Sequence, residues 1–326
     1  MSLPALWRNT ISSMAEEFRH IPVLLNECID NLAIKPDGIY VDGTIGGGGH
    51  ASHICERLSD RGILIGIDRD KDALSASLGR LEGQVCKRIL VQSDYADIKT
   101  VLAGQGLEKI DGALLDLGVS SYQLDNAKRG FSYMHDAPLD MRMDQSGSLT
   151  AYDVINGYER DAITRVISEY GEERWARRIS DFICEARRKK PIETTGELVE
   201  IIKAAIPARA RREGPHPAKR TFQAIRIEVN DELGQLRSAI DDFCDVLAPG
   251  GRLCIITFHS LEDRIVKDIF RKRVNPCVCP PEFPVCVCGK VGDVKKVTGK
   301  PITPGDEEIR NNPRARSAKL RVLEKL

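Results

Sequence analysis

The stretch that decides the fold runs from Gly38 to His50 and reads Gly38-Ile-Tyr-Val-Asp42-Gly-Thr-Ile-Gly-Gly-Gly-Gly-His50. Its first part is β-branched and aromatic, which predicts a short strand that ends at Asp42. The glycines predict a tight turn, and the apolar spacing over 50–58 predicts a helix after it. Glycines let a backbone approach a bound group closely, and a helix N-terminus offers free N–H groups. This unit therefore predicts a site for a negatively charged or carboxylate-bearing cofactor.

The alternation of strand and helix continues along the chain. Apolar runs predict strands over 62–67, 88–92, 112–116 and 251–258, with helices over 71–81 and 220–243. Continuous apolar strands separated by helices are typical of a parallel sheet that is buried on both faces. We therefore expect one α/β domain.

A helical segment interrupts this domain. Residues 125–148 are rich in turn-forming residues, and the apolar spacing predicts helices over 151–156, 161–170, 173–189 and 195–205. We expect four segments: a disordered leader (1–19), the first part of the α/β domain (20–123), a helical insert (124–219) and the second part of the α/β domain (220–326). The leader is also compatible with a transit peptide, or with a true start at Met14.

Two cofactor classes fit the glycine turn. Gly46-x-Gly48-x-x-Ala51 matches the dinucleotide fingerprint, and Asp68 follows at the distance expected of a ribose-binding acid. The same layout serves S-adenosylmethionine, with Asp42 before the glycines and Asp68 at the ribose hydroxyls. The glycine motif alone does not separate a nicotinamide cofactor from S-adenosylmethionine.

The end of the fourth predicted strand favours S-adenosylmethionine. Ligands of open α/β sheets bind at the carboxyl ends of the strands, so Asp116 and the loop after it should face the cofactor. An acid there suits a sulfonium-bearing amino acid better than a nicotinamide. Tyr95, shortly after the third strand, is placed to stack on the adenine or to border it.

Nine motifs in this order resemble the bacterial 16S ribosomal RNA cytosine-N4 methyltransferases. The resemblance runs from His20 to Arg321, with small departures at Ile45, Gly47 and Tyr122. The motifs are Asp42-Gly-Thr-Ile-Gly-Gly-Gly-Gly-His50, Ile67-Asp-Arg-Asp70, Asp116-Leu-Gly-Val-Ser-Ser121, Arg129-Gly-Phe-Ser132, Pro138-Leu-Asp-Met-Arg-Met-Asp144, Tyr170-Gly-Glu-Glu173, His216-Pro-Ala-Lys-Arg-Thr-Phe-Gln-Ala224, Ala248-Pro-Gly-Gly-Arg-Leu253 and Phe258-His-Ser-Leu-Glu-Asp-Arg264.

The resemblance implies a Rossmann-like S-adenosylmethionine-dependent methyltransferase fold with an inserted helical domain for the substrate. It implies methylation of the exocyclic N4 amine of a cytosine in the decoding centre of the small ribosomal subunit. It implies that S-adenosylmethionine binds at Gly48, Gly49, His50, Asp68, Tyr95, Asp116 and Gln123.

Cytosine N4 is a poor nucleophile, because its lone pair is delocalised into the ring. Hydrogen-bond acceptors near N4 would help, and we expect Asp116 with Ser120 and Ser121 to orient the amine. The alternative is that the two serines only shape the loop. The Asp/Asn-Pro-Pro-aromatic tetrapeptide of DNA amino-methyltransferases is absent here.

The net charge is zero, from 48 Lys and Arg against 48 Asp and Glu, which argues against a bulk polycation. The charge is segregated, however: residues 203–228 hold seven bases and two acids, and residues 264–326 hold 15 bases and seven acids. These two segments predict an RNA-binding face. Its expected residues are Arg209, Arg211, Arg212, Lys219, Arg220, Arg314 and Arg316.

Four of the ten cysteines lie within twelve residues: Cys277, Cys279, Cys286 and Cys288. Four thiols that close a short loop are typical of a structural zinc site, although the pairs are spaced C-x-C rather than C-x-x-C. Free thiols in a mobile loop, or disulfides, are the alternatives. The other six cysteines are scattered, which suits buried free thiols in a reducing cytoplasm.

No apolar run approaches the roughly 20 residues of a membrane span. We therefore expect a cytoplasmic methyltransferase whose partner is 16S ribosomal RNA in the small ribosomal subunit. The alternatives are an NAD-dependent oxidoreductase, and a non-catalytic RNA-binding assembly factor with the same fold. Binding of S-adenosylmethionine rather than NADH would exclude the oxidoreductase, and methyl transfer to the RNA would exclude the non-catalytic assembly factor.

Overall fold

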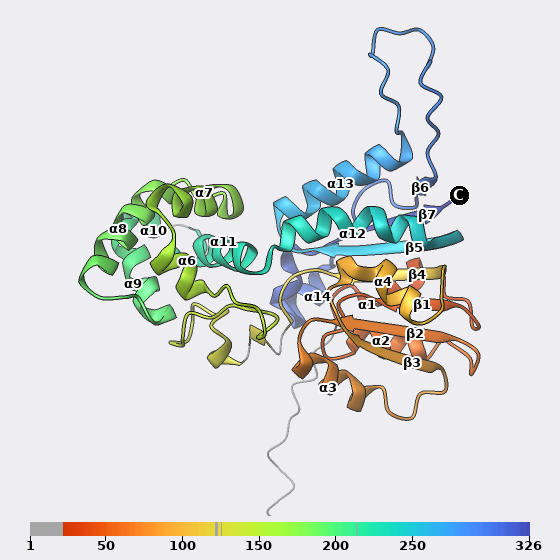
Figure 1. The fold of residues 1–326 in the computed structure, drawn as a ribbon, viewed down its shortest axis with the longest axis horizontal. Helices are drawn as coiled ribbons and strands as arrows, with labels where there is room; N and C mark the ends of the chain where they lie inside the picture. The colour runs from red at the N-terminus through yellow and green to blue at the C-terminus, as the bar shows by residue number, and fades with distance from the viewer. Residues whose placement is uncertain (1–21, 121–122, 125, 213) are drawn as a thin grey trace, which may run out of the picture.

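A computed structural model describes residues 22–120, 123–124, 126–212 and 214–326. Seven strands form one sheet in the order β3-β2-β1-β4-β5-β7-β6 (Figure 1). The first five strands in this order run parallel to one another, whereas β7 pairs antiparallel with both β5 and β6. The strands are β1 (Ile39–Asp42), β2 (Ile63–Asp68), β3 (Lys87–Gln92), β4 (Ile110–Asp116), β5 (Leu247–Thr257), β6 (Val294–Lys296) and β7 (Lys319–Lys325).

Side chains of the strands alternate between two hydrophobic clusters, one on each face of the sheet. On β2, for example, Ile65 and Ile67 join one cluster and Leu64 joins the other, as the period-two geometry of a strand requires. The first face is covered by α4 (Ile98–Gly104), α12 (Glu232–Val246) and α13 (Ser260–Val274). The second is covered by α1 (Leu25–Leu32), α2 (Gly49–Cys55), α3 (Lys71–Arg80) and the segment η3 (Pro313–Ser317) after α14 (Asp306–Asn311).

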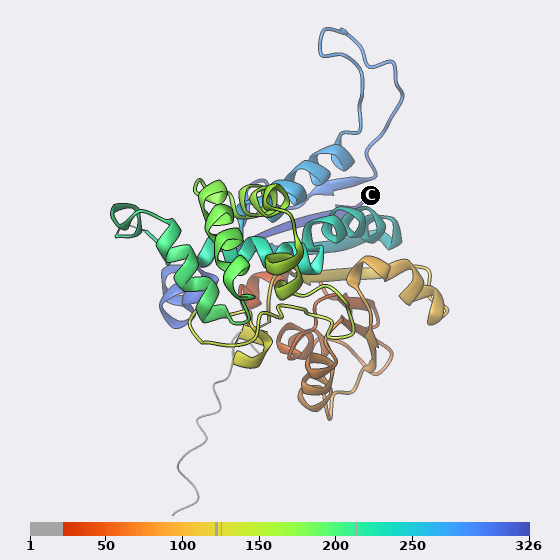
Figure 2. The ribbon, with the colours of Figure 1, turned by 60° about the vertical axis from the view of Figure 1, so that its left-hand side comes forward.

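The residues between β4 and α12 form a separate helical body with its own hydrophobic cluster. It lies beside the sheet in Figure 1 and comes toward the viewer in Figure 2. Capping boxes start two of its helices, with Thr150 before α6 and Thr194 before α9. Its helices are α6 (Ala151–Gly157), α7 (Arg160–Gly171), α8 (Ala176–Lys189), α9 (Thr195–Ala205), α10 (Ala208–Arg211) and α11 (Lys219–Asn230).

The prediction of one helix over 220–243 is wrong. The chain breaks at Asp231, which takes φ +47°, and the segment forms α11 and α12. Asn230 explains the break: its Nδ2 donates to the Met141 carbonyl at 2.8 Å, and its Oδ1 accepts from the Met143 N–H at 2.7 Å. These bonds tie the end of α11 to the insert, and Phe222 and Ile225 also pack there. The proposed division at 219 and 220 stays a prediction.

The other predicted strands and helices are present, with ends that differ by a few residues. The sequence did not predict α1, α4, α13 and α14, nor the antiparallel pair β7 and β6. The leader at 1–19 lies outside the described residues. Within the described part of the chain, no helix is both long and apolar enough to cross a membrane.

Candidate active site

Three carboxylates stand at the carboxyl ends of three adjacent strands. Asp68 ends β2, Asp42 ends β1 and Asp116 ends β4, and these strands are neighbours in the sheet. Burial raises the pKa of all three, to about 7 for Asp42 and well above the ordinary range for Asp116. The charge of Asp68 further raises the pKa of Asp42, and the charge of Asp42 that of Asp116. This edge of the sheet is therefore a place where a bound cation would be stabilised.

The glycine turn borders the three carboxylates, and its glycines serve different purposes. Gly46 and Gly48 have φ +50° and +76°, a conformation that other residues rarely adopt. The Gly46 N–H donates to Asp68 Oδ2 at 2.9 Å, which ties the turn to β2. A side chain at Gly49 would meet Pro22 at 2.6 Å, so this glycine allows close packing. A side chain at Gly47 would meet nothing within 4 Å, so this part of the turn is open to a ligand.

Asp116 faces His50 on one side. Its Oδ2 lies 3.6 Å from His50 Nδ1, which is longer than a hydrogen bond, and among the described residues its buried Oδ1 has no hydrogen-bond partner. His50 is fixed from behind, because its Nε2 lies 3.0 Å from the Val23 carbonyl oxygen, to which it donates as the Nε2–H tautomer. The Asp116 backbone N–H donates to Thr44 Oγ1 at 2.6 Å. A buried carboxylate oxygen without a partner is unusual and marks a site of function.

The loop after β4 is held by its own polar groups. The Ser120 N–H donates to Gln123 Oε1 at 3.1 Å, and the Gln123 N–H donates to Ser120 Oγ at 3.2 Å. Gln123 Nε2 donates to Asp70 Oδ2 at 3.0 Å. Both side chains therefore shape the loop, while the Ser120 hydroxyl keeps its own proton to donate. Ser121 lies outside the described residues.

A buried ion pair beneath this loop was not singled out from the sequence. Arg129 Nη1 donates to Asp70 Oδ2 at 2.8 Å, and its Nη2 donates to the carbonyls of Arg142 and Met143, each at 2.9 Å. Both side chains of the pair are 4% exposed. The pair joins the start of α3 to the first loop of the insert. Both residues lie inside quoted motifs, which was the signal that could have found them.

Tyr95 begins the short helix η1 (Tyr95–Asp97), which packs against α12. Its Cβ would lie 3.2 Å from a side chain placed at Gly43, so the tyrosine borders the start of the glycine turn. Burial raises the pKa of its hydroxyl. Asp94 caps η1 and pairs with Arg69, which fixes the approach to Tyr95. Its contact with adenine stays a prediction.

A second polar cluster at this edge was also missed. His259 caps α13, and Glu262 Oε2 accepts the Phe258 N–H at 2.7 Å. Beside it Arg226 donates to both carboxylate oxygens of Glu232, at 2.8 and 2.9 Å. Glu232 is therefore held by its ion pair with Arg226, and Glu262 by its part in the cap of α13. The charge of Glu262 adds to the rise in the pKa of Asp116, so the cluster borders the same site.

The comparisons with known proteins decide between the cofactor classes. Residues 17–326 match the model of the MraW methylase family. The chain belongs to the MraW methylase family. It is 61% identical over 312 residues to a ribosomal RNA small subunit methyltransferase H of Acetivibrio thermocellus, and 58% identical over 310 residues to one of Clostridioides difficile. Each match covers 95% of this chain and 100% of the relative. Membership of a methylase family favours methyl transfer over the nicotinamide alternative.

The predicted RNA-binding residues of this family member are exposed and lie in two places. Five of them lie on or beside α10 and at the start of α11: Arg209, Arg211, Arg212, Lys219 and Arg220. A hollow of about 210 Å³ next to them is lined by Trp175, His216 and Pro217, among others. Arg314 and Arg316 lie in η3, directly before β7. Because Lys319 of β7 pairs with Thr257 at the carboxyl end of β5, η3 sits at the same edge of the sheet as the three carboxylates.

The ten cysteines are all free thiols. Five of the six scattered ones are buried, as predicted, and Cys184 is half-buried. The other four lie together in the loop between α13 and β6, and their sulfur atoms are all within 4.8 Å of one another.

Proposed function

We propose that this chain transfers the methyl group of S-adenosylmethionine to the exocyclic N4 amine of a cytosine in the 16S RNA of the small ribosomal subunit, at its decoding centre and in the cytoplasm. Near-complete coverage of relatives that are named as ribosomal RNA small subunit methyltransferases supports the substrate class. The MraW methylase family supports the reaction class. The position of the base and the N4 atom come from the motif resemblance.

The observation that carries the cofactor assignment is the trio of carboxylates with raised pKa values beside an open glycine turn. S-adenosylmethionine supplies an activated methyl group on a sulfonium centre, and its α-amino group is a second cation. These cations would stabilise the ionised carboxylates of Asp42 and Asp116, and the carboxylate of Asp68 suits the ribose hydroxyls. The residues that would hold the cofactor are Gly48, Gly49, His50, Asp68, Tyr95, Asp116 and Gln123.

The geometry refines two of these assignments. Gly49 packs on Pro22, and Gln123 is bonded to Asp70 and to the Ser120 backbone. These contacts support a role for both residues in positioning the glycine turn and the loop after β4, next to the cofactor that they would help to hold. Asp116 is the residue that we expect to accept a hydrogen bond from the cytosine amine, through the oxygen that has no partner in the described part of the chain. Such a bond would draw the N4 hydrogen away and direct the lone pair toward the methyl carbon.

RNA would approach across the carboxyl edge of the sheet. The target base must leave its stack to reach Asp116, as is normal for enzymes that modify bases. Phosphate contacts would come from the exposed arginines and lysines of α10, α11 and η3. The hollow beside α10 offers an aromatic and cationic lining that suits an extruded nucleotide.

The direct test uses small subunits from cells that lack this protein. They are incubated with the purified chain and S-adenosylmethionine, and the nucleosides of the digested RNA are identified by mass spectrometry. We expect one N4-methylcytidine per subunit, formed far more slowly with Asp116→Asn. A methyl group on the cytosine ring carbon would overturn the N4 assignment. Tight binding of subunits without any methyl transfer would favour the non-catalytic assembly factor.

A further inference from the structure

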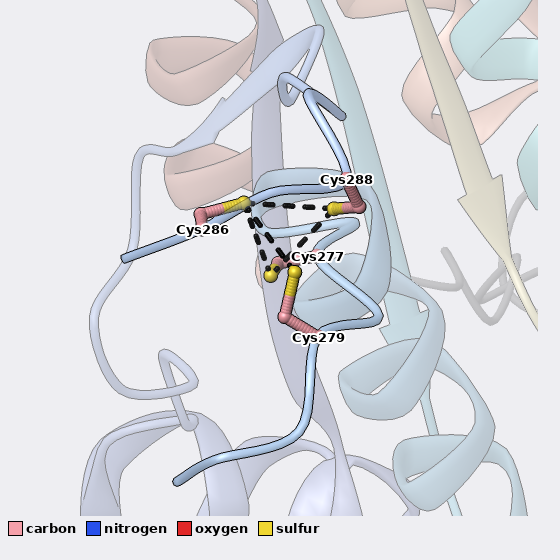
Figure 3. A group of neighbouring side chains, drawn as sticks. All are labelled: Cys277, Cys279, Cys286 and Cys288. Carbon is pink, nitrogen blue, oxygen red and sulfur yellow. Dashed lines mark hydrogen bonds between the residues drawn. The ribbon is translucent and has the colours of Figure 1, made fainter. Parts of the chain in front are cut away.

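The loop between α13 and β6 projects away from the sheet in both views (Figures 1 and 2). It carries the four cysteines, whose sulfur atoms point toward one another (Figure 3). We propose that Cys277, Cys279, Cys286 and Cys288 bind one structural Zn²⁺ ion in this family member. The proposal concerns a part of the chain that the methyl-transfer chemistry does not use.

The separations of the sulfur atoms match a single tetrahedral ion. Four of the six edges measure 3.5, 3.8, 3.6 and 3.8 Å. A tetrahedron with Zn–S bonds of about 2.3 Å has edges of about 3.8 Å. A disulfide instead requires about 2.05 Å between two sulfur atoms. The arrangement therefore has the size of a ZnS₄ site.

The C-x-C spacing produces this arrangement through simple chain geometry. In an extended chain, residues i and i+2 point to the same side and the residue between them points away. The intervening Val278 and Val287 are 66% and 73% exposed, so each pair presents two sulfur atoms on one side. Between the pairs, the Phe283 N–H donates to the Pro280 carbonyl at 3.1 Å, which turns the chain back on itself. Prolines in this turn reduce the entropy that closing the loop would cost.

The backbone also provides what metal thiolates need. The Val287 N–H donates to Cys279 Sγ at 3.3 Å. Four thiols this close cannot all ionise on their own, and a divalent cation removes that obstacle.

The position of the loop points to a structural role. α13 starts at the carboxyl end of β5 and returns across the sheet, and Val294 of β6 pairs with Lys325 at the far end of β7. The four cysteines therefore lie beyond the amino edge of the sheet, opposite the three carboxylates. Apolar side chains of this loop, such as Phe283 and Val285, are exposed, so few packing contacts fix its course. A metal ion supplies the missing constraint.

The test starts with the full chain, purified without chelator, and measures its metal content by mass spectrometry. We expect about one zinc per chain, lost in Cys279→Ser and in Cys288→Ser but retained in the matched control Cys184→Ser. Cobalt added to the metal-free chain should give the intense visible absorption of tetrahedral cobalt thiolate, with one equivalent saturating the signal. Removal of zinc should expose residues 280–292 to protease, while binding of S-adenosylmethionine stays unchanged.

Four results would overturn the proposal. The first is less than about a tenth of an equivalent of zinc together with no tetrahedral cobalt spectrum. The second is iron at stoichiometric level in place of zinc. The third is a mass that shows the four thiols paired as two disulfides in protein kept under a reducing buffer. A loss of methyl transfer in Cys288→Ser with zinc retained would also contradict a purely structural ion at this loop.

Discussion

Cofactor binding should depend on pH through Asp42, and the direction follows from its environment. Burial raises the pKa of this carboxyl from 3.8 to about 7 in the ligand-free chain. A sulfonium and an ammonium favour the ionised carboxylate, so a bound cofactor lowers that pKa again. Binding therefore releases a proton, and affinity rises as pH rises toward 7.

The size of the effect can be worked out from the pKa. With a value of about 7, about half of Asp42 is ionised at pH 7 and about a tenth at pH 6. If only the ionised form binds, the dissociation constant increases about fivefold between pH 7 and pH 6, which is ~1 kcal/mol. The cofactor α-amino group, with a pKa of about 7.7–8.0, stays mostly protonated at both values and does not cancel this change. Asp116, whose pKa is also raised, acts in the same direction.

Isothermal titration calorimetry measures both quantities. The affinity is compared at pH 6 and pH 7, and two buffers with different heats of protonation report the protons released. Asp42→Asn should flatten the pH dependence whatever its absolute affinity, while the exposed control Asp60→Asn should keep it. Equal dissociation constants at pH 6 and pH 7 in the wild-type chain, with no proton release, would refute this reasoning.

Other perturbations have equally direct outcomes. Asp116→Asn should lower the single-turnover rate by about 10²–10³-fold, because an acceptor aimed at the amine is weakened; a rate within a factor of three of wild type would remove Asp116 from the mechanism. Arg129→Ala leaves Asp70 buried without its partner, and urea unfolding should show a loss of about 3–5 kcal/mol. The exposed pair of Arg61 is the control, with a loss of less than about 1 kcal/mol on Arg61→Ala. Protonation of Asp42 stabilises the folded chain fully below about pH 4, and this stabilisation is lost as pH rises through about 7. Asn resembles the protonated carboxyl, so Asp42→Asn should stabilise the ligand-free chain at pH 8 by up to about 4 kcal/mol, which is measured as a raised melting temperature. Neutralising Arg209, Arg211 and Arg212 together should reduce the slope of log RNA affinity against log salt concentration by about 2. The control neutralises Arg57, Arg61 and Lys87 at the amino edge of the sheet, and it should leave that slope unaltered.

The sequence predicted the parts of the fold that local pattern determines. Each parallel strand is a short apolar run, and Gly46 and Gly48, which have positive φ, lie in the predicted glycine turn, so periodicity and turn chemistry were sufficient there. The acids at the strand ends followed as well, because the chain positions of Asp42, Asp68 and Asp116 identify the strand ends. The distinction between methyl transfer and nicotinamide chemistry did not follow from spacing alone. The acid at the end of β4 and the motif resemblance favoured methyl transfer, and the family match decided it.

Long-range contacts account for what the sequence did not predict. The break between α11 and α12 depends on bonds from Asn230 to Met141 and Met143, almost 90 residues earlier. The Asp70–Arg129 pair spans 59 residues and gives no local pattern. The loop roles of Ser120 and Gln123 depend on which hydrogen bonds form, and no composition rule states that. Tertiary contacts of this kind override local propensity.

The direction of β7 bears on how a chain of zero net charge would recognise RNA in the proposed function. β7 runs antiparallel to β5, so the residues just before it lie at the carboxyl edge of the sheet. A parallel β7 would have carried Arg314 and Arg316 to the amino edge, away from the acids. The helical insert leaves the sheet after β4, at that same carboxyl edge, and brings the α10 cations with it. Two basic segments about 100 residues apart in the chain therefore belong to parts of the fold that start from or lie at the carboxyl edge. In the proposed function the carboxylates would meet a cationic methyl donor and the cations would meet phosphates, so charge segregation would bring both ligands to that edge.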